Sequence, residues 1–236
     1  MSLAGGMFLL LKKELSENLI LILTGFAAGV LLSTAFIDLF PEALESGAES
    51  NDILMFALSG IVIFFLFERF LLWFHHHHET VEGIRPSILL ITFGDSVHNF
   101  IDGVAIAGAF LVSFPLGVST AIAVAAHEIP QEIADFSVML SNKLPKNKII
   151  AFNLFSALTS LTGAIGTFYL ASTIERYLPM VISFTAGMFT YIAASDLIPE
   201  LHRSADKKTN AWHQALAFLS GIIITARLIS ILHGSH

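Results

Sequence analysis

Residues 26–42 read FAAGVLLSTAFIDLFPE, and residues 184–200 read FTAGMFTYIAASDLIPE. The two stretches align without a gap at a constant offset of 158, with Phe, Ala-Gly, Asp-Leu and Pro-Glu in register. Two apolar helices can look alike by chance, but the shared D-L-x-P-E ending favours a true repeat. The copies lie five predicted spans apart, an odd number, so they would cross a membrane in opposite directions. Inverted repeats of this kind are typical of many secondary transporters.

The composition is that of a membrane protein. Of the 236 residues, 55% are hydrophobic and only 13% are charged, and the mean hydropathy is +0.75. A soluble domain usually has about 25% charged residues. The net charge of −7 argues against nucleic-acid binding. The chain has no cysteine, which excludes disulfides, thiolate metal sites, iron–sulfur clusters and cysteine nucleophiles.

Seven segments are long enough to cross roughly 30 Å of hydrocarbon as helices. They are residues 18–40, 52–74, 87–112, 116–141, 147–171, 177–199 and 212–232. We therefore expect an all-α polytopic membrane protein, with one transmembrane domain over residues 1–236 and a helical bundle that contains inverted repeats. Residues 2–11 are too short to cross alone and are interpreted as part of an incomplete helix.

The distribution of positive charge predicts the orientation. When the spans are followed alternately, one side of the membrane receives ten of the twelve Lys and Arg residues, and the other receives only Arg176 and Arg227. The first side is therefore predicted to be cytoplasmic. A His-rich loop at residues 75–86 would lie on that side, where it could bind metal or act only as a solvated linker. Its histidines are His75, His76, His77 and His78.

Two polar motifs interrupt the third and fourth spans, HNFIDG at residues 98–103 and HEIPQE at residues 127–132. His98 and Asp102 are four residues apart and project from one face of a helix. His127 and Gln131 have the same spacing in the next span, beside a row that begins with Glu128. Because consecutive spans are antiparallel neighbours by default, these polar faces can meet.

A divalent metal ion is the most economical explanation for such a cluster. Ionisable residues at membrane depth cost several kcal/mol each and usually face a cavity or a partner. A metal dication accepts both imidazole nitrogen and carboxylate oxygen and offsets buried negative charge. We expect one shell from His98, Asp102, His127 and Gln131, and an adjacent oxygen-rich shell from Asn99, Glu128 and the shared Asp102. Further candidates for the same cavity are Glu132 and Asn153.

Other interpretations of the motifs stay open. A single intramembrane His or Asn is most often an interhelical hydrogen bond, and the same acids and histidines could form a proton relay. The spacing also resembles the H-E-x-x-H helix of zinc proteases, although Gln131 replaces the second histidine and Pro130 precedes it. The four acids that end the two repeat copies are either cation stations or interfacial helix ends. They are Asp38, Glu42, Asp196 and Glu200.

The paired motifs resemble the signature of the ZIP (Zrt/Irt-like) family of divalent metal transporters, which is close to H-N-x-x-[DE]-G followed by H-E-x-P-H-E. The resemblance extends from about residue 17 to the sixth span. It implies an eight-helix fold with inverted repeats, a binuclear metal site between the two motif helices, movement of metal into the cytosol and an elevator-like slide of the motif helices. The ligands it implies are His98, Asn99, Asp102, His127, Glu128 and the position of Gln131.

This chain departs from the family pattern in two ways. Gln131 stands where many members have His or Glu, and a neutral amide is a weaker ligand, so we expect weaker binding or different selectivity. The family's first helix is represented only by SLAGGMFLLLKK near the N-terminus. We expect a chain with an incomplete first helix to have its N-terminus inside.

The sequence therefore predicts a transporter of divalent transition metal, foremost Zn²⁺, into the cytoplasm, and not an enzyme. Fe²⁺, Mn²⁺, Co²⁺ and Cd²⁺ suit the same ligands. The alternatives are a zinc-dependent intramembrane hydrolase with Glu128 or Glu132 as general base, and a static metal-binding membrane protein. The expected location is the plasma or inner membrane, and the expected partners are metal ions and lipid, with a homodimer left open.

Overall fold

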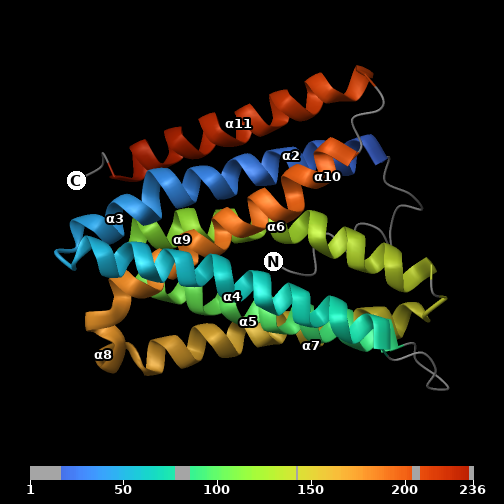
Figure 1. The fold of residues 1–236 in the computed structure, drawn as a ribbon, viewed down its shortest axis with the longest axis horizontal. Coiled ribbons are helices and arrows are strands. Elements are labelled where there is room, and N and C mark those ends of the chain that lie inside the picture. The colour runs from blue at the N-terminus through green and yellow to red at the C-terminus, as the bar shows by residue number, and fades with distance from the viewer. Residues whose placement is uncertain (1–16, 78–85, 142, 204–207, 234–236) are drawn as a thin grey trace.

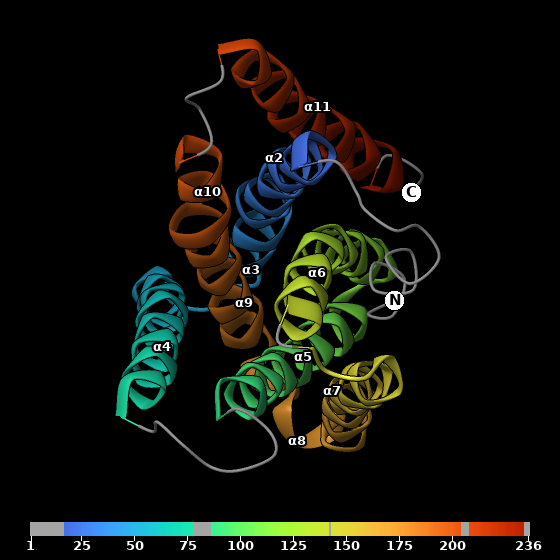
Figure 2. The same cartoon turned by 90° about the vertical axis from the view of Figure 1, so that its right-hand side faces the viewer.

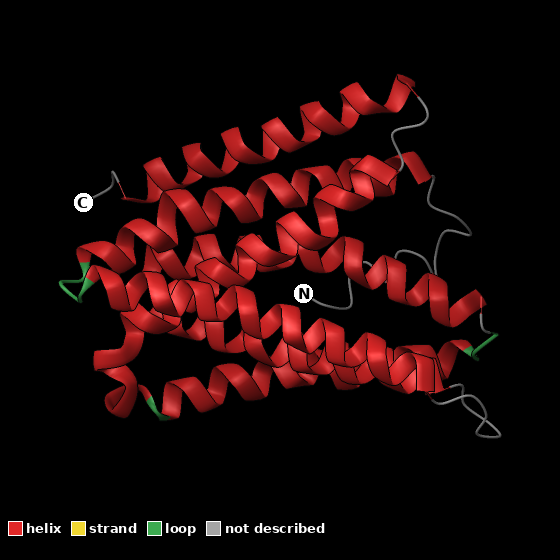
Figure 3. Ribbon diagram, viewed as in Figure 1, coloured by secondary structure: helices red, strands yellow, loops and turns green. Residues whose placement is uncertain are grey.

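The computed structural model describes residues 17–77, 86–141, 143–203 and 208–233, and within these ranges the chain forms helices joined by short turns and contains no strand (Figure 3). The first helix, α2 (Glu17–Ser33), continues through a π-helical turn, η1 (Thr34–Leu39), into α3 (Phe40–Glu45). Four long helices follow: α4 (Ser50–His77), α5 (Pro86–Val112), α6 (Phe114–Ser141) and α7 (Lys146–Tyr169). The short α8 (Ala171–Ile174) and η2 (Glu175–Tyr177) lead to α9 (Leu178–Ile192), the π-helical turn η3 (Ala193–Leu197), α10 (Ile198–Arg203) and finally α11 (Lys208–His233).

The predicted all-α polytopic membrane protein is confirmed. Five segments are long and apolar enough to cross a membrane by length and composition. They are Asn18–Glu45, Ser50–Phe70, Lys146–Tyr169, Ala171–Arg203 and Ala211–His233. The helices α5 and α6 are not among them, because their polar motifs lower the mean hydropathy. The division into seven spans stays a prediction.

Two predicted segments fall wholly or partly outside the described residues. The proposed incomplete helix at residues 2–11 lies outside them. Of the predicted His-rich loop, His75, His76 and His77 belong to the end of α4, whereas residues 78–85, which include His78, lie outside.

The two copies of the sequence repeat are α2 and α9, which run in opposite directions through the bundle (Figure 1). Each copy ends in a π-helical turn at the same repeat position, η1 before Pro41 and η3 before Pro199. Single π-helical turns inside α-helices are rare and occur frequently at functional sites. The repeat is therefore conserved in backbone conformation as well as in sequence.

Each repeat helix packs along a second helix, α2 along α11 and α9 along α4 (Figure 2). In the first pair, a Cβ atom on Gly29 would collide with the carbonyl oxygen of Phe218, and one on Gly221 would collide with that of Phe26. The two backbones can lie this close only because both positions are glycine.

The second pair repeats these contacts. A Cβ atom on Gly187 would collide with the carbonyl oxygen of Ala57, and one on Gly60 would collide with that of Phe184. The α9 residues lie 158 positions after their α2 equivalents, whereas the α4 residues lie 161 positions before their α11 equivalents. Ser-Gly-Ile at residues 59–61 accordingly matches Ser-Gly-Ile at residues 220–222. The structural repeat is thus a pair of helices.

The remaining long helices, α5, α6 and α7, form a group that packs against both pairs. Within this group α5 packs most extensively on α7. At their crossing, a Cβ atom on Gly103 would collide with the backbone of Ser160, and one on Gly163 with that of Phe100. The close crossing fixes the polar motif of α5 relative to α7.

Candidate metal site

The polar motifs of α5 and α6 meet inside the bundle. One ligand atom from each of four side chains lies within 4.8 Å of the others. The four residues are His98, Asp102, His127 and Glu128, hereafter the quartet, and all are buried. The Nε2 atoms of His98 and His127 are 3.0 Å apart. The Oδ2 atom of Asp102 lies 3.3 Å from Nε2 of His127 and 3.6 Å from Nε2 of His98.

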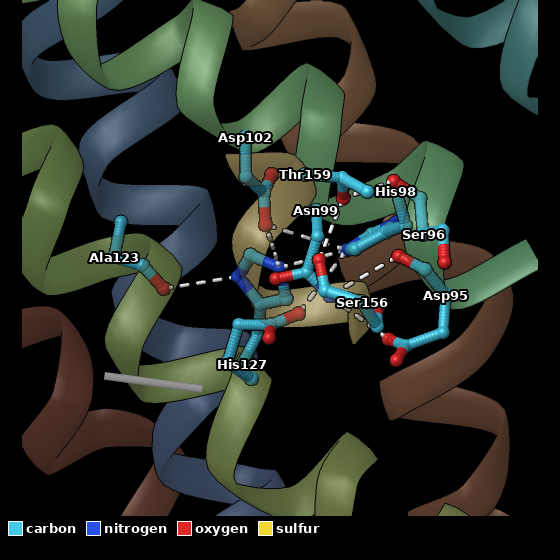
Figure 4. Close-up of polar contacts among 10 residues, drawn as sticks. Asp95, Ser96, His98, Asn99, Asp102, Ala123, His127, Ser156 and Thr159 are labelled. Atoms are coloured by element: carbon cyan, nitrogen blue, oxygen red, sulfur yellow. Dashed lines mark hydrogen bonds and ion pairs between the residues drawn. The ribbon is translucent and has the colours of Figure 1, made fainter. Parts of the chain in front are cut away.

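The orientation of His127 is set by the backbone of its own helix (Figure 4). Its Nδ1 atom lies 3.0 Å from the carbonyl oxygen of Ala123, one turn earlier in α6. A carbonyl can only accept, so Nδ1 carries the proton and donates it. In the neutral ring Nε2 then presents a lone pair to the quartet. A second hydrogen bond of this kind is the usual way in which proteins orient a histidine ligand.

The carboxylates of the quartet lack hydrogen-bond donors. All four carboxylate oxygens of Asp102 and Glu128 are buried, and none accepts a hydrogen bond from a residue that the structure describes. Both carboxylates lie within 4 Å of an imidazole, with His98 Nε2 lying 3.8 Å from Oε1 of Glu128. Unsatisfied buried carboxylates are costly unless a cation compensates them. Two imidazole nitrogens and two carboxylates match the ligand preferences of Zn²⁺ and of related divalent ions.

Asn99 lies beside the quartet with its amide nitrogen turned toward α7. This nitrogen donates to Oδ1 of Asp95 at 3.0 Å, to the carbonyl oxygen of Asp95 at 3.1 Å and to Oγ of Ser156 at 3.1 Å. Asn99 and Ser156 are buried. The amide oxygen of Asn99 therefore points away from Asp95.

Comparison with known proteins agrees with this geometry. The profile of the ZIP zinc transporter family matches residues 1–83 and 75–229, almost the whole chain. The chain belongs to the ZIP zinc transporter family. Among curated relatives, zinc transporter ZIP10 of Danio rerio is 36% identical over 119 residues, zinc transporter ZIP6 of Homo sapiens is 33% identical over 132 residues, and zinc transporter ZIP4 of Mus musculus is 36% identical over 122 residues. These alignments cover 50–55% of this chain but only 14–18% of the relatives.

In this ZIP protein a cavity of about 860 Å³ adjoins the quartet. It begins at His98 and extends between α2, α4, α5, α6 and the segment from α9 to α10. Gln131 is half-buried and lines this cavity one turn after His127, on the same face of α6. Glu132 is buried one turn after Glu128 and is outside the group of four.

Asn153, the candidate ligand from α7, points toward a different part of this ZIP bundle. Its amide nitrogen donates to the carbonyl oxygen of Ile149 at 3.0 Å and lies 4.0 Å from the sulfur of Met139. The α7 side chain that reaches the motif of α5 is Ser156, three residues later. A small hydroxyl in an apolar helix gives no sequence signal of such a role, so Ser156 was not predicted.

The acids that end the two repeat copies, expected to be either cation stations or interfacial helix ends, lie at both ends of the ZIP bundle. At one end, Asp38 in η1 is buried, accepts a hydrogen bond from Ser119 of α6, and its Oδ1 lies 3.2 Å from Nε2 of His233 in α11. At the other end, Asp196 in η3 is exposed, and Glu200 pairs with Arg203 at 2.7 Å. Both of these acids line the cavity.

Glu42 is half-buried in α3, and the structure places it in no polar cluster among the described residues.

Glu68 is an acid of the cavity wall that could not be selected from the sequence. This residue of α4 accepts a hydrogen bond from the hydroxyl of Tyr191 in α9, and both side chains line the cavity. Asp95 likewise lies in the cavity wall. A helical acid without a motif is usually a solvated residue, which is why these two could not be selected.

Proposed function

We propose that this chain carries divalent transition-metal ions, foremost Zn²⁺, across a membrane into the cytoplasm, and that the quartet is the site through which they pass. The observation that carries the proposal is the convergence of two imidazole nitrogens and two buried carboxylates that accept no hydrogen bond from the described part of the chain. The two carboxylates bring two negative charges, which one dication neutralises. Fe²⁺, Mn²⁺, Co²⁺ and Cd²⁺ fit the same ligands.

The surroundings of the quartet support release toward the cytoplasm. The cavity leads from His98 to Glu200 and Arg203, at the end of the bundle that the distribution of basic residues predicts to be cytoplasmic. Beyond the quartet, toward the other end, buried apolar side chains such as Leu116, Ala123 and Phe189 pack together. A metal ion in the quartet would thus face the cytoplasm, and inverted repeats provide a second arrangement that opens the outer side.

A second metal ion beside the first is part of the proposal. Glu128 clusters with Asp102, and Asn99 lies three residues before Asp102 in α5, so Asp102 could bridge two ions. The amide oxygen of Asn99 points away from the groups that hold its nitrogen. Glu128 is a member of the quartet, so it would coordinate the metal rather than act as a free general base. This arrangement favours transport over hydrolysis.

The test is zinc uptake into sealed proteoliposomes under a gradient of free zinc, with the parent chain and with Asp102→Ala. We expect saturable flux from the parent and none from the variant. The matched control is Asp52→Ala, which removes an exposed aspartate in the first turn of α4 and should leave flux unchanged. If the parent binds zinc stoichiometrically but shows no flux, the chain is a static metal-binding protein and the transport proposal is wrong.

A further inference from the structure

We propose that Asp95 and Ser156 are positioning residues that turn the amide of Asn99 so that its oxygen, and not its nitrogen, faces the second metal position. The inference rests on the proposed function, because it assigns a task to the surroundings of that site. It concerns the contact between α5 and α7 beside the quartet and not the quartet itself.

The contacts form a closed triangle (Figure 4). The Asn99 amide nitrogen donates to the carboxylate of Asp95 at 3.0 Å and to the hydroxyl of Ser156 at 3.1 Å. The Ser156 hydroxyl is also hydrogen-bonded to the side chain of Asp95. Asp95 lies one turn before Asn99 in α5, and Ser156 reaches in from α7, so two helices hold one amide group.

Without these acceptors the amide would turn the other way. The neighbouring carboxylates of Asp102 and Glu128 lack hydrogen-bond donors from the described residues. Asn99 lies three residues before Asp102 in α5, so the two side chains are neighbours on the helix surface. The NH₂ group of Asn99 is a donor that a carboxylate attracts strongly. An amide turned toward them would place its nitrogen, which has no lone pair available for a metal, where the ligand oxygen is needed. Asp95 and Ser156 compete for the NH₂ group and so keep the metal position free of a donor.

Zinc titration of the full chain in detergent measures this effect, because it reports stoichiometry and the affinity of each position. We expect two bound ions in the parent. Asp95→Ala and Ser156→Ala should weaken the second position by about 10- to 100-fold, the usual effect of removing a group that orients a metal ligand, and leave the first unchanged. Asp95→Asn keeps a carbonyl oxygen that can accept from Asn99, so it should restore most of the affinity.

Thr159→Val is the matched control. The Thr159 hydroxyl lies at the same contact of α5 and α7 and donates to the carbonyl oxygens of Ser96 and Ser156 at 2.6 Å, whereas the hydrogen bonds of Asn99 to described residues go to Asp95 and Ser156. If this control weakens the second position as much as Ser156→Ala does, loosened helix packing explains both variants, and the proposal is wrong.

A double-mutant cycle separates positioning from direct coordination. In an Asn99→Ala background no amide remains to be positioned, so Asp95→Ala should cause no further loss. A further loss of tenfold or more would mean that Asp95 acts on the metal itself and would overturn the proposal. A parent that binds only one ion would overturn it as well, while the quartet and its flux test would stand. If the double-mutant cycle gives the expected result but no flux is observed, only the transport function is refuted.

Discussion

His127 and Glu128 are neighbours in the sequence and lie about 100° apart around α6, yet both reach the same point. The helix α5 lies alongside α6 and contributes His98 and Asp102 to the same cluster. Each imidazole therefore has a carboxylate within 4 Å, and the hydrogen bond from His127 to Ala123 leaves one nitrogen for the metal. At this scale, affinity depends on ligand atoms that are already oriented before the metal arrives.

Removal of one such ligand should abolish tight binding. We expect His127→Ala to raise the zinc dissociation constant of the quartet by at least about 100-fold, because even loss of an orienting partner costs up to that amount. Isothermal titration calorimetry in detergent measures the change. His202→Ala, which removes an exposed histidine of α10, should bind zinc like the parent. Equal affinities of His127→Ala and the parent would show that metal binds elsewhere.

Gln131 offers the opposite experiment. It lines the cavity one turn after His127, so a histidine there would bring an imidazole to the side of the quartet that faces the cavity. Imidazole binds zinc better than a neutral amide, and we expect Gln131→His to tighten binding by about tenfold, or 1.4 kcal/mol. Slower release should lower the maximal flux. Gln131→Leu, similar in size and without ligand atoms, should weaken binding by less than about tenfold, because a neutral amide is a weak ligand. An unchanged affinity would show that Gln131 is not a ligand.

The residues that the sequence identifies and those it misses differ in a physical way. His98, Asp102, His127 and Glu128 carry charge or imidazole at helical spacing inside apolar segments, and such residues need a partner. Ser156 is a small hydroxyl that can satisfy itself on its own helix, so its role depends on where α7 crosses α5. The orientation of a side chain across a helix crossing is a tertiary property, which a single sequence does not contain.

At the scale of helices, the crossings are set by glycine. Gly29 and Gly187 are equivalent in the repeat, and each lets its helix approach the backbone of a partner helix. The repeat of α2 and α9 can be recognised in the sequence because the two helices share a long motif. The equivalence of α4 and α11 is harder to recognise, since lipid-facing positions tolerate many apolar residues and only the short motif Leu-Ser-Gly-Ile, at residues 58–61 and 219–222, is retained without interruption at the crossing.

Gly29→Ala should therefore destabilise the bundle. The added Cβ atom would overlap the carbonyl oxygen of Phe218, and separation of α2 from α11 should lower the free energy of unfolding by about 1–3 kcal/mol. Gly187→Ala should act in the same way on α9 and α4. Gly166→Ala is the control, because no atom lies within 4 Å of its added Cβ atom. Thermal unfolding in detergent followed by circular dichroism gives the comparison, and a stable Gly29→Ala variant would contradict the close crossing.

At the scale of the whole molecule, two equivalent helix pairs flank the group of α5, α6 and α7. The quartet belongs entirely to α5 and α6, whereas the cavity on one side of it and the apolar packing that closes the other side also involve α2, α4 and α9. Access to the quartet can therefore alternate if the central group shifts against the pairs. Such a shift leaves the ligand distances intact, which a metal ion requires throughout transport.

A covalent link between the central group and a flanking pair should stop this movement. The chain has no cysteine, so introduced pairs react only with each other. A Cβ atom on Gly108 of α5 would lie 3.2 Å from Cγ1 of Val181 in α9, with the Cβ atom of Val181 beyond 4 Å. This separation is at the upper end of the range for a disulfide between Gly108→Cys and Val181→Cys. We expect oxidation of this double variant to abolish zinc flux in proteoliposomes, and reduction with dithiothreitol to restore it.

The control is a disulfide within one flanking pair. A Cβ atom on Gly25 of α2 would lie 3.7 Å from the Cβ atom of Ala217 in α11, near the mean separation in natural disulfides, and 2.9 Å from the carbonyl oxygen of Gln214. The backbone must therefore adjust slightly, and the reduced double variant has to show flux before oxidation is compared. Oxidation of Gly25→Cys with Ala217→Cys joins helices that stay together in either arrangement, so flux should persist. If both disulfides block flux, the pairs themselves must open during transport. If neither does, metal passes the quartet without a shift of α5 against α9, and the division into moving and fixed helices fails.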